Sequence, residues 1–232
     1  MPSAVPEHVA LIPDGNRRWA QMRNVEIEEG HRTGFLIVAP RLIEALWSGG
    51  VSVATLWMFS TDNWKRTPNE IRNLMRIYGE FVELMIPMAR QHGAALRTIG
   101  RRDRIPPELQ HVLAQAEHAT GDGTERTLQL ALDSGGRDEI VRLVAAVARR
   151  CAELGDAGEE AAARALDDAR VSIRDPDLIV RSAGEQRLSG FLPLQVSYAE
   201  LYFSDRFFPD MDVDVVRQAL RAYGERQRRF GR

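Results

Sequence analysis

An acidic residue and two arginines follow one another closely near the N-terminus, directly after an apolar segment. The segment ends at Pro13, and the run Asp-Gly-Asn-Arg-Arg occupies positions 14–18. A strand that turns into a helix leaves backbone N–H groups unpaired, which favours an anion, and guanidinium groups suit phosphate oxygens. Asp14 would repel a phosphate unless a divalent cation such as Mg²⁺ lay between them. The stretch predicts either a metal–phosphate site or an ordinary helix start with Asp14 as its N-cap.

Three more polar turns follow apolar segments of strand type, at 60–66, 133–137 and 181–189. In the last of these turns, Arg181, Arg187 and Ser189 have the residue types of a second phosphate clamp. When these three residues are taken alone, a surface loop is the simpler interpretation.

The elements that would position these turns alternate between strand and helix patterns. Besides the first strand, strands are expected at 51–59, 94–99, 127–132, 177–180 and 198–204, and helices at 30–47, 71–86, 107–118 and 213–228. Such alternation predicts one α/β domain over residues 1–232, with a mainly parallel sheet covered by helices on both faces. Ligands bind outside the carboxyl ends of such strands. Four polar turns at one edge therefore predict a site for a multiply charged anion.

Two ionisable side chains and one apolar stripe leave alternatives open. Glu200 lies in an otherwise apolar strand segment, where an unpaired carboxylate is costly, so we expect it to pair with an arginine or with the metal. His31 is either an ordinary histidine at a helix start or a donor to phosphate. The residues from Ile71 to Ile86 repeat apolar side chains at helical spacing, which indicates either core packing or the wall of an apolar cavity.

The composition excludes several classes of function. The net charge of −2 argues against general nucleic-acid binding, and the single cysteine, Cys151, argues for a reducing compartment without an internal disulfide. No apolar run approaches the ~18 residues of a membrane span, and the N-terminus lacks a signal-peptide layout, so we expect no transmembrane segment and a cytoplasmic location. Phosphate-loop, dinucleotide-binding, zinc-cluster and serine-hydrolase motifs are absent from the sequence.

Five ordered motifs extend over nearly the whole chain. They are His-Val-Ala-Leu-Ile-Pro-Asp-Gly-Asn-Arg-Arg-Trp-Ala at 8–20, Gly-His-Arg-Thr-Gly at 30–34, Phe-Ser-Thr-Asp-Asn-Trp-Lys-Arg at 59–66, Asp-Leu-Ile-Val-Arg-Ser-Ala-Gly-Glu-Gln-Arg-Leu-Ser at 177–189 and Tyr-Ala-Glu-Leu-Tyr-Phe at 198–203. This set resembles the cis-prenyltransferases, which include the undecaprenyl diphosphate synthases. The run Arg-Arg-Phe-Gly at 228–231 resembles the Arg-x-Gly that these enzymes place near the substrate across a dimer.

The resemblance implies a homodimer with an apolar substrate tunnel between sheet and helices. It implies that an allylic prenyl diphosphate joins a second C5 prenyl diphosphate with release of diphosphate. Asp14, helped by Glu200, would hold Mg²⁺, and Asp14 and Asn63 would be the catalytic residues. The allylic diphosphate would lie on the turn at 15–18, and the second diphosphate on the clamp at 181–189. The substrate-binding residues indicated by the matched motifs are Gly15, Asn16, Arg17, Arg18, Trp19, His31, Ser60, Thr61, Asp62, Trp64, Arg66, Arg181, Arg187, Leu188 and Ser189.

Several positions depart from the chain-elongating pattern of that family. Ile27 stands where an arginine is usual, Asp133-Ser134 replaces Asn-Tyr, and Leu194 replaces a tryptophan. These departures resemble lavandulyl-type synthases of secondary metabolism, which couple two allylic units head-to-middle into branched products. Asn16 and His31 are kept as in the elongating enzymes. The sequence therefore predicts a short-chain synthase and leaves branched and regular head-to-tail coupling open.

Two classes of protein other than an active synthase remain to be considered. A catalytically silent partner subunit of this family would lack the metal-binding aspartate, whereas Asp14, Asn63 and Glu200 are all present. A phosphate-binding regulatory module would explain the polar turns but would leave the apolar stripe without a use. The sequence therefore favours an enzyme.

Overall fold

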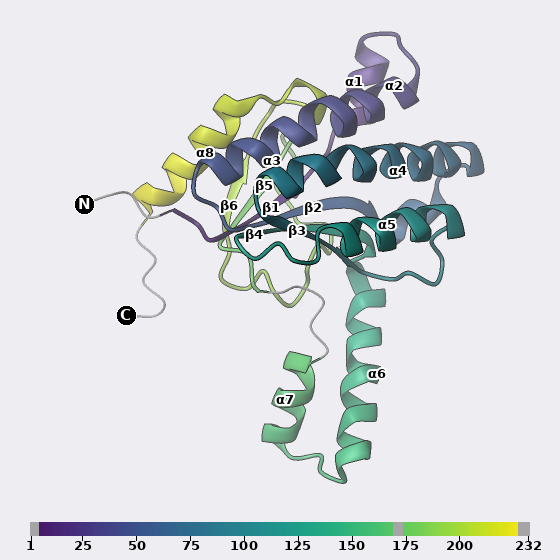
Figure 1. Ribbon diagram of the computed structural model, residues 1–232, viewed down its shortest axis with the longest axis vertical. Helices are drawn as coiled ribbons and strands as arrows, with labels where there is room; N and C mark the ends of the chain where they lie inside the picture. The colour runs from purple at the N-terminus through teal and green to yellow at the C-terminus, as the bar shows by residue number, and fades with distance from the viewer. Residues whose placement is uncertain (1–4, 169–173, 227–232) are drawn as a thin grey trace.

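The computed structural model describes residues 5–168 and 174–226, and strands alternate with helices along the chain (Figure 1). The elements of its first half are β1 (His8–Ile12), α1 (Asn16–Met22), α2 (Ile27–Arg32), the π-helix η1 (Thr33–Val38), α3 (Ala39–Ser48), β2 (Val53–Ser60), the 3₁₀ helix η2 (Thr61–Lys65), α4 (Pro68–Gln91), β3 (Ala94–Ile99) and α5 (Pro107–Ala119). Those of its second half are β4 (Arg126–Ser134), α6 (Gly136–Leu154), α7 (Glu159–Asp168), β5 (Leu178–Arg181), β6 (Glu200–Phe203), the 3₁₀ helix η3 (Phe208–Asp210) and α8 (Val213–Glu225).

The six strands form one sheet in the order β3-β4-β2-β1-β5-β6, and every neighbouring pair is parallel. The register pairs Ile12 of β1 with Arg181 of β5, and Ser60 of β2 with Ser134 of β4. The carboxyl ends of these strands therefore meet at one edge of the sheet, as the predicted α/β fold requires.

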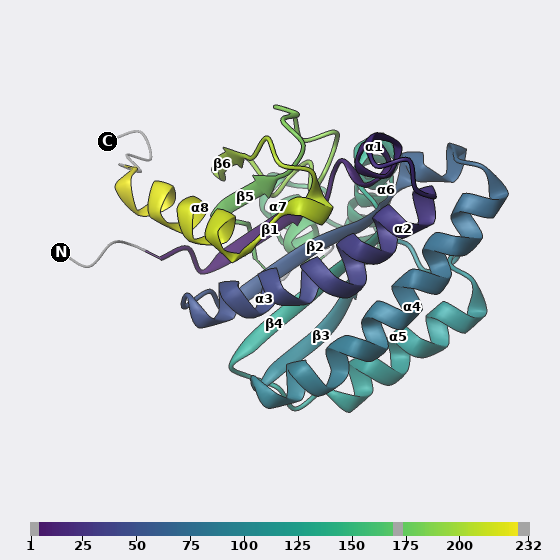
Figure 2. The ribbon, with the colours of Figure 1, turned by 90° about the horizontal axis from the view of Figure 1, so that it is seen from above.

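The two faces of the sheet are covered differently. Alternate side chains of β1, such as Val9 and Leu11, join the larger core with α3, α4, α5 and α8 (Figure 2). Ala10 and Ile12 face the other way and pack with Phe191 and Leu192 of the segment between β5 and β6. The predicted covering by helices thus holds for the first face, whereas this segment covers much of the second.

The long helix expected at 30–47 contains an irregular turn. Pro40 has no N–H to donate to the carbonyl four residues earlier, and the backbone just before it is π-helical in η1. The three helical pieces together run from Ile27 to Ser48, so proline widens the helix rather than ending it.

The apolar stripe at 71–86 lies on α4 and is core. Most of its side chains are almost completely buried against the sheet, namely Leu74, Met75, Tyr78, Phe81, Val82 and Met85. The structure does not show the predicted apolar tunnel between α4 and the sheet in the described part of the chain.

Helices α6 and α7 extend away from the sheet as a pair (Figure 1). No helix among the described residues is both long and apolar enough to cross a membrane. Helix α8 ends at Glu225, and the motif at 228–231 lies outside the described residues.

Candidate active site

A cavity of about 420 Å³ lies at the carboxyl ends of β1, β2 and β5. Three of the four predicted polar turns supply residues to it, together with a histidine from α2. The predicted site residues that line the cavity are Asp14, Gly15, Asn16, Arg17, Arg18, His31, Ser60, Asn63, Arg66, Arg181 and Ser189. The structure therefore brings together most of the set that the sequence indicated.

Asp14 presents its carboxylate to the cavity and is not a helix cap. The N-cap of α1 is Gly15, in the left-handed conformation at φ +93°, and no side chain caps the helix. Asp14 Oδ1 accepts a hydrogen bond from the Gly15 N–H at 2.6 Å and lies 3.4 Å from Arg18 Nη2. Oδ2 accepts from Arg181 Nη2 at 2.9 Å, and about a third of the side chain, 30%, stays exposed. The ordinary helix-start interpretation is therefore wrong.

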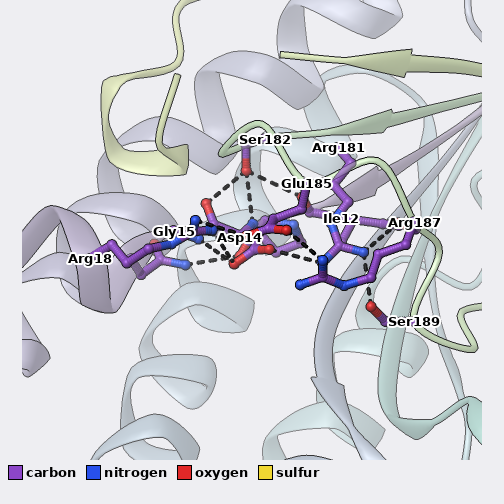
Figure 3. Close-up of polar contacts among 11 residues, drawn as sticks. Ile12, Asp14, Gly15, Arg18, Arg181, Ser182, Glu185, Arg187 and Ser189 are labelled. Carbon is purple, nitrogen blue, oxygen red and sulfur yellow. Dashed lines mark hydrogen bonds and ion pairs between the residues drawn. The ribbon is translucent and has the colours of Figure 1, made fainter. Parts of the chain in front are cut away.

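Arg181 is the buried counterpart of Asp14. Its side chain is only 5% exposed, and besides Asp14 it donates to Ser189 Oγ at 2.9 Å and to the Arg187 carbonyl (Figure 3). These bonds tie the end of β5 to the turn after β1. Arg181 thus fixes the position of Asp14 and also lines the cavity.

Two glycines let the helix at 27–38 approach the Asp14 turn closely. A Cβ on Gly30 would lie 2.3 Å from the Asn16 carbonyl oxygen, and a Cβ on Gly34 would lie 2.4 Å from Asn16 Oδ1. Both distances are far below contact, so neither position accepts another residue without movement. The two glycines of the Gly-His-Arg-Thr-Gly motif therefore allow this helix to pack directly against Asn16, and this packing places His31 at the cavity.

His31 shares its surroundings with a carboxylate. Its ring is buried, and neither ring nitrogen has a hydrogen-bond partner among the described residues. Glu70 Oε1 lies 3.8 Å from His31 Nε2, accepts from Arg66 at 3.0 Å and lies 3.8 Å from Arg17 Nε. Burial lowers the pKa of His31, and the neighbouring His31 ring, with Arg66 and Arg17, lowers the pKa of Glu70. Burial therefore favours the uncharged ring, which lies at the cavity wall with Glu70 beside Nε2.

Asn63 is held by the turn that contains it. Its Oδ1 accepts from the Ser60 N–H at 3.0 Å, while the Ser60 side chain accepts from the Asn63 N–H, which completes a capping box around η2. These two bonds hold the Asn63 side chain in a fixed orientation at the cavity.

The remaining predicted residues do not line this cavity. They are Trp19, Thr61, Asp62, Trp64, Arg187, Leu188 and Glu200. Trp19 donates to Asp210, Asp62 pairs with Lys65 at the surface, and Trp64 packs on Phe59. Their contacts support the turns rather than form the wall.

Glu200 is paired with an arginine and lies away from Asp14. The register aligns Glu200 with Leu178 and Leu178 with Val9, so Glu200 lies level with the early part of β1. At ~3.3 Å per residue, this places it about 15 Å before Asp14 along the strand direction. Its Oε2 accepts from Arg226 at 2.6 Å. The arginine partner is therefore the observed one, and one chain does not bring Glu200 and Asp14 to a shared metal.

The turn at 133–137 lies at the expected edge of the sheet, next to Ser60, but none of its residues lines the cavity. Asp133 is fully buried and accepts from Arg104 Nε at 2.7 Å. The Gly136 N–H donates a hydrogen bond to the Gly190 carbonyl at 2.7 Å. A Cβ on Gly135 would lie 2.7 Å from the same carbonyl oxygen, so the two loops pack closely. This turn braces the neighbouring loops.

Sequence reasoning missed several residues of the wall and its support. Phe35, Trp57, Met58 and Tyr78 line the cavity from below, and Glu70 stands behind His31. Tyr78 was part of the apolar stripe, but periodicity did not show which end of the stripe faces a cavity. Glu70 lies four positions after Arg66, a spacing at which ion pairs are common, and this is the signal that could have found it.

The arrangement suits a multiply charged anion with an apolar tail. Arg17, Arg18, Arg66 and Arg181 line the cavity around one carboxylate, that of Asp14, and the aromatic side chains of Phe35, Trp57 and Tyr78 line it as well. A guanidinium group can bind two phosphate oxygens at once, and aromatic rings pack against an apolar chain.

Comparison with known proteins agrees with this geometry. Residues 12–231 match the undecaprenyl diphosphate synthase model of the prenyltransferases. The chain is 40% identical to a ditrans,polycis-undecaprenyl-diphosphate synthase ((2E,6E)-farnesyl-diphosphate specific) of Pseudomonas aeruginosa, over 98% of this chain and 91% of that protein. It is 37% identical to an isoprenyl transferase of Streptococcus pneumoniae, over 100% and 94%.

Two solved structures share the fold. A lavandulyl diphosphate synthase from Lavandula x intermedia, in complex with dimethylallyl diphosphate, superposes with a TM-score of 0.92 at 31% identity, over 98% of this chain and 99% of that one. A probable undecaprenyl diphosphate synthase from Campylobacter jejuni superposes with a TM-score of 0.78 at 28% identity, over 99% and 100%. The chain therefore belongs to the undecaprenyl diphosphate synthase family and is a prenyltransferase.

Proposed function

We propose that the protein is a Mg²⁺-dependent short-chain prenyl diphosphate synthase. It joins an allylic prenyl diphosphate to a second C5 prenyl diphosphate and releases diphosphate. The observation that carries this proposal is the cavity in which a partly exposed aspartate, four arginines and several aromatic side chains meet.

The donor set at Asp14 fits Mg²⁺ in the presence of a diphosphate. Each carboxylate oxygen of Asp14 keeps a lone pair after its bonds to Gly15 and Arg181. Among the described residues, no group of three or more His, Cys, Asp or Glu side chains forms a metal site of its own. Magnesium often takes one carboxylate and completes its shell with substrate phosphates and water, so a single aspartate suffices here.

The residues of the cavity divide the reaction between them. Arg17, Arg18 and Arg66 neutralise the leaving diphosphate as the allylic C–O bond breaks and its electron pair departs. Mg²⁺ bound at Asp14 would add to that charge neutralisation. The double bond of the second substrate then attacks the allylic carbon, and a proton is lost. Trp57 and Tyr78 in the cavity wall exclude water and stabilise the developing cation, and Asn63 orients the reacting ends and assists proton removal.

A layer of aromatic rings below the cavity supports a short product. Tyr78 lies 4.9 Å from Phe35 and 6.4 Å from Phe59, measured between ring centroids, and Phe35 lies 6.1 Å from Phe81. The volume of about 420 Å³ is near the lower end of the ~300–1,000 Å³ usual for small-ligand sites. Tyr78→Ala should lengthen the product, whereas Met85→Ala, deeper in the same stripe, should destabilise the core without lengthening it.

Branched, head-to-middle coupling is the subtype that we propose. The segments 133–136 and 189–194, which contain the departures at Asp133, Ser134 and Leu194, contact one another through Gly136 and Gly190, and both contact Trp57 of the cavity wall. Trp57 Nε1 donates to the Ser134 carbonyl at 3.3 Å, and the Trp57 ring stacks on the Phe191 ring with 4.8 Å between the ring centroids. The similarity to the lavandulyl diphosphate synthase supports this subtype. The curated relatives favour regular chain elongation, which is the alternative.

A direct assay separates these alternatives. The protein is incubated with Mg²⁺ and dimethylallyl diphosphate, with and without isopentenyl diphosphate, and the products are analysed by mass spectrometry after dephosphorylation. Branched products from dimethylallyl diphosphate alone support the proposed subtype. Strict dependence on isopentenyl diphosphate with a linear cis product would refute it, and inactivity on every pair would favour a silent partner subunit. The variant Ile27→Arg restores the arginine that is usual in the family and tests whether Ile27 selects the substrate. An unchanged set of accepted substrates would exclude that role for Ile27.

A homodimer fits the exposed apolar side chains of α6. Ile140, Val141 and Val144 are 40%, 56% and 63% exposed on a helix that extends from the body. A metal held by both Asp14 and Glu200 would also need Glu200 from a second copy of the chain. Cytoplasmic location and a role in secondary metabolism stay predictions.

A further inference from the structure

One carboxylate, that of Glu185, contacts arginines on both sides of the site. Arg18 Nη1 donates to Glu185 Oε1 at 2.9 Å, and Arg187 Nη1 donates to Oε2 (Figure 3). Arg18 belongs to the turn proposed for the allylic diphosphate, and Arg187 belongs to the clamp proposed for the second one. Glu185 therefore bridges two groups that the proposed function assigns to different substrates.

The backbone fixes the place of this carboxylate. Ala183 and Gly184 have φ values of +73° and +72°. Their N–H groups donate to the Arg206 carbonyl at 2.7 Å and to the Ser204 carbonyl at 2.9 Å. A non-glycine residue adopts the left-handed region only where its surroundings hold it there, and such residues gather at functional sites. The turn before Glu185 is therefore rigid.

The same turn is also fixed to the Asp14 turn. A Cβ on Gly15 would lie 2.8 Å from Ala183 Cβ, so the two backbones pack without space between them. The Ala183 side chain is buried. Glu185 is thus placed beside Arg18 by the fold itself and not by the ion pair alone.

The two pairs that Glu185 makes are of a kind that a ligand can displace. The side chains of Arg18 and Arg187 are 42% and 61% exposed, whereas that of Arg181 is 5% exposed. Ion pairs between solvated groups are weak and form and break readily. A diphosphate carries more negative charge than one carboxylate and offers more acceptor oxygens, so it can replace Glu185 on either arginine.

We propose that Glu185 is an internal competing anion that holds Arg18 and Arg187 when the sites are empty and sets how tightly both diphosphates bind. It is a positioning residue, because it acts through the two arginines. Its negative charge remains beside the bound diphosphates and opposes them. Removing the charge should therefore tighten substrate binding and slow the departure of the released diphosphate. The inference rests on the proposed function for the identity of the anions.

Calorimetric titration of the full chain with Glu185→Gln tests this without turnover. The probes are dimethylallyl diphosphate, isopentenyl diphosphate and inorganic diphosphate, each in the presence of Mg²⁺. All three should bind roughly fivefold more tightly, the size expected for release of two exposed ion pairs. The control Glu44→Gln, which makes the same change in net charge on α3, should leave each affinity unchanged. Equal tightening in both variants, or no tightening in Glu185→Gln, would overturn the proposal.

Steady-state kinetics add a readout that a purely structural role would not move. In Glu185→Gln, KM and kcat should fall together, and inorganic diphosphate should inhibit at lower concentration. A raised KM for either substrate would contradict the proposal. If the unaltered protein binds none of the three probes, the proposed function fails; if it binds them and Glu185→Gln binds them equally, only this inference fails.

Discussion

The turns after β1 and β4 use the same residue types in opposite ways. Each has an aspartate at a strand end and a glycine with positive φ close behind it, Gly15 at +93° and Gly135 at +98°. Each aspartate pairs with an arginine from the neighbouring strand or the loop after it, Arg181 at the end of β5 and Arg104 in the loop that follows β3. After β1 the carboxylate is 30% exposed over an arginine that is 5% exposed. After β4 the carboxylate is fully buried and its arginine, Arg104, is 34% exposed.

In each ion pair the buried member holds the other, more exposed member in place, and the exposed member differs between the two turns. Buried Arg181 holds Asp14 out toward the cavity, where a metal and a phosphate could reach it. Buried Asp133 holds Arg104 outward instead, with its guanidinium carbon 5.6 Å from the centre of the Trp64 ring. The first pair is therefore suited to chemistry and the second to support.

The largest expected effect is on turnover at Asp14. Asp14→Ala should lower kcat by about 10³-fold, because the proposed metal and the charge arrangement of the leaving group both depend on that carboxylate. The protein should stay folded, although its melting temperature should fall because the buried Arg181 loses its carboxylate partner. Assays of prenyl transfer alongside thermal unfolding check both statements, and activity within tenfold of the unaltered protein would remove Asp14 from the mechanism.

Asp133 should show the opposite balance. Asp133→Ala should lower the free energy of unfolding by about 2–3 kcal/mol, because two charge-assisted hydrogen bonds in the interior are lost. The turnover of the folded fraction should fall less than tenfold. Urea unfolding measures the first effect, and Asp133→Asn, which keeps an acceptor, should recover part of the stability. A loss of turnover as large as that of Asp14→Ala would abolish the distinction between the two turns.

Gly15 and Gly136, one from each turn, also differ in how closely they are packed against other residues. Gly15→Ala should destabilise by about 2 kcal/mol, because the new Cβ would lie 2.6 Å from Phe207 Cδ1 in addition to the strain of a positive φ. Gly136→Ala is the matched control: its φ is +66° and no atom lies within 4 Å of the added Cβ, so about 1 kcal/mol is expected. Equal losses in urea unfolding would show that the close approach at Gly15 has no energetic weight.

The smallest effect concerns Arg104. Arg104→Lys keeps the charge but cannot form the two-pronged contact with Asp133, so a loss of about 1 kcal/mol is expected. Thermal unfolding measures it, with Arg102→Lys on the same loop as the control. An unchanged stability would mean that the buried carboxylate is satisfied by charge alone.

Much of the fold and site followed from the sequence because the signals were local. Strand and helix patterns predicted the alternation, and the motifs placed Asp14, Asn63 and Arg181 correctly at one edge of the sheet. The sequence left open whether Asp14 caps α1, since Asp and Gly are both common at N-caps and only the backbone angle distinguishes them.

What sequence could not supply were contacts between distant segments. Asp133 is neutralised by an arginine 29 positions earlier, and Glu200 is displaced from Asp14 by the strand register, which depends on the whole sheet. Helical periodicity marks the apolar face of α4 but does not say whether a neighbour fills the space beside it. Glu185 gave no signal of its own, because its importance comes from two arginines that the fold brings to it.

Titration of inorganic diphosphate in the presence and absence of Mg²⁺ tests the central claim most directly. Calorimetry would compare the unaltered protein with Asp14→Asn and Asp133→Asn. We expect Mg²⁺ to strengthen diphosphate binding by about tenfold or more in the unaltered protein and in Asp133→Asn, and this gain to be lost in Asp14→Asn. The same gain in all three proteins would contradict a metal–diphosphate site at Asp14.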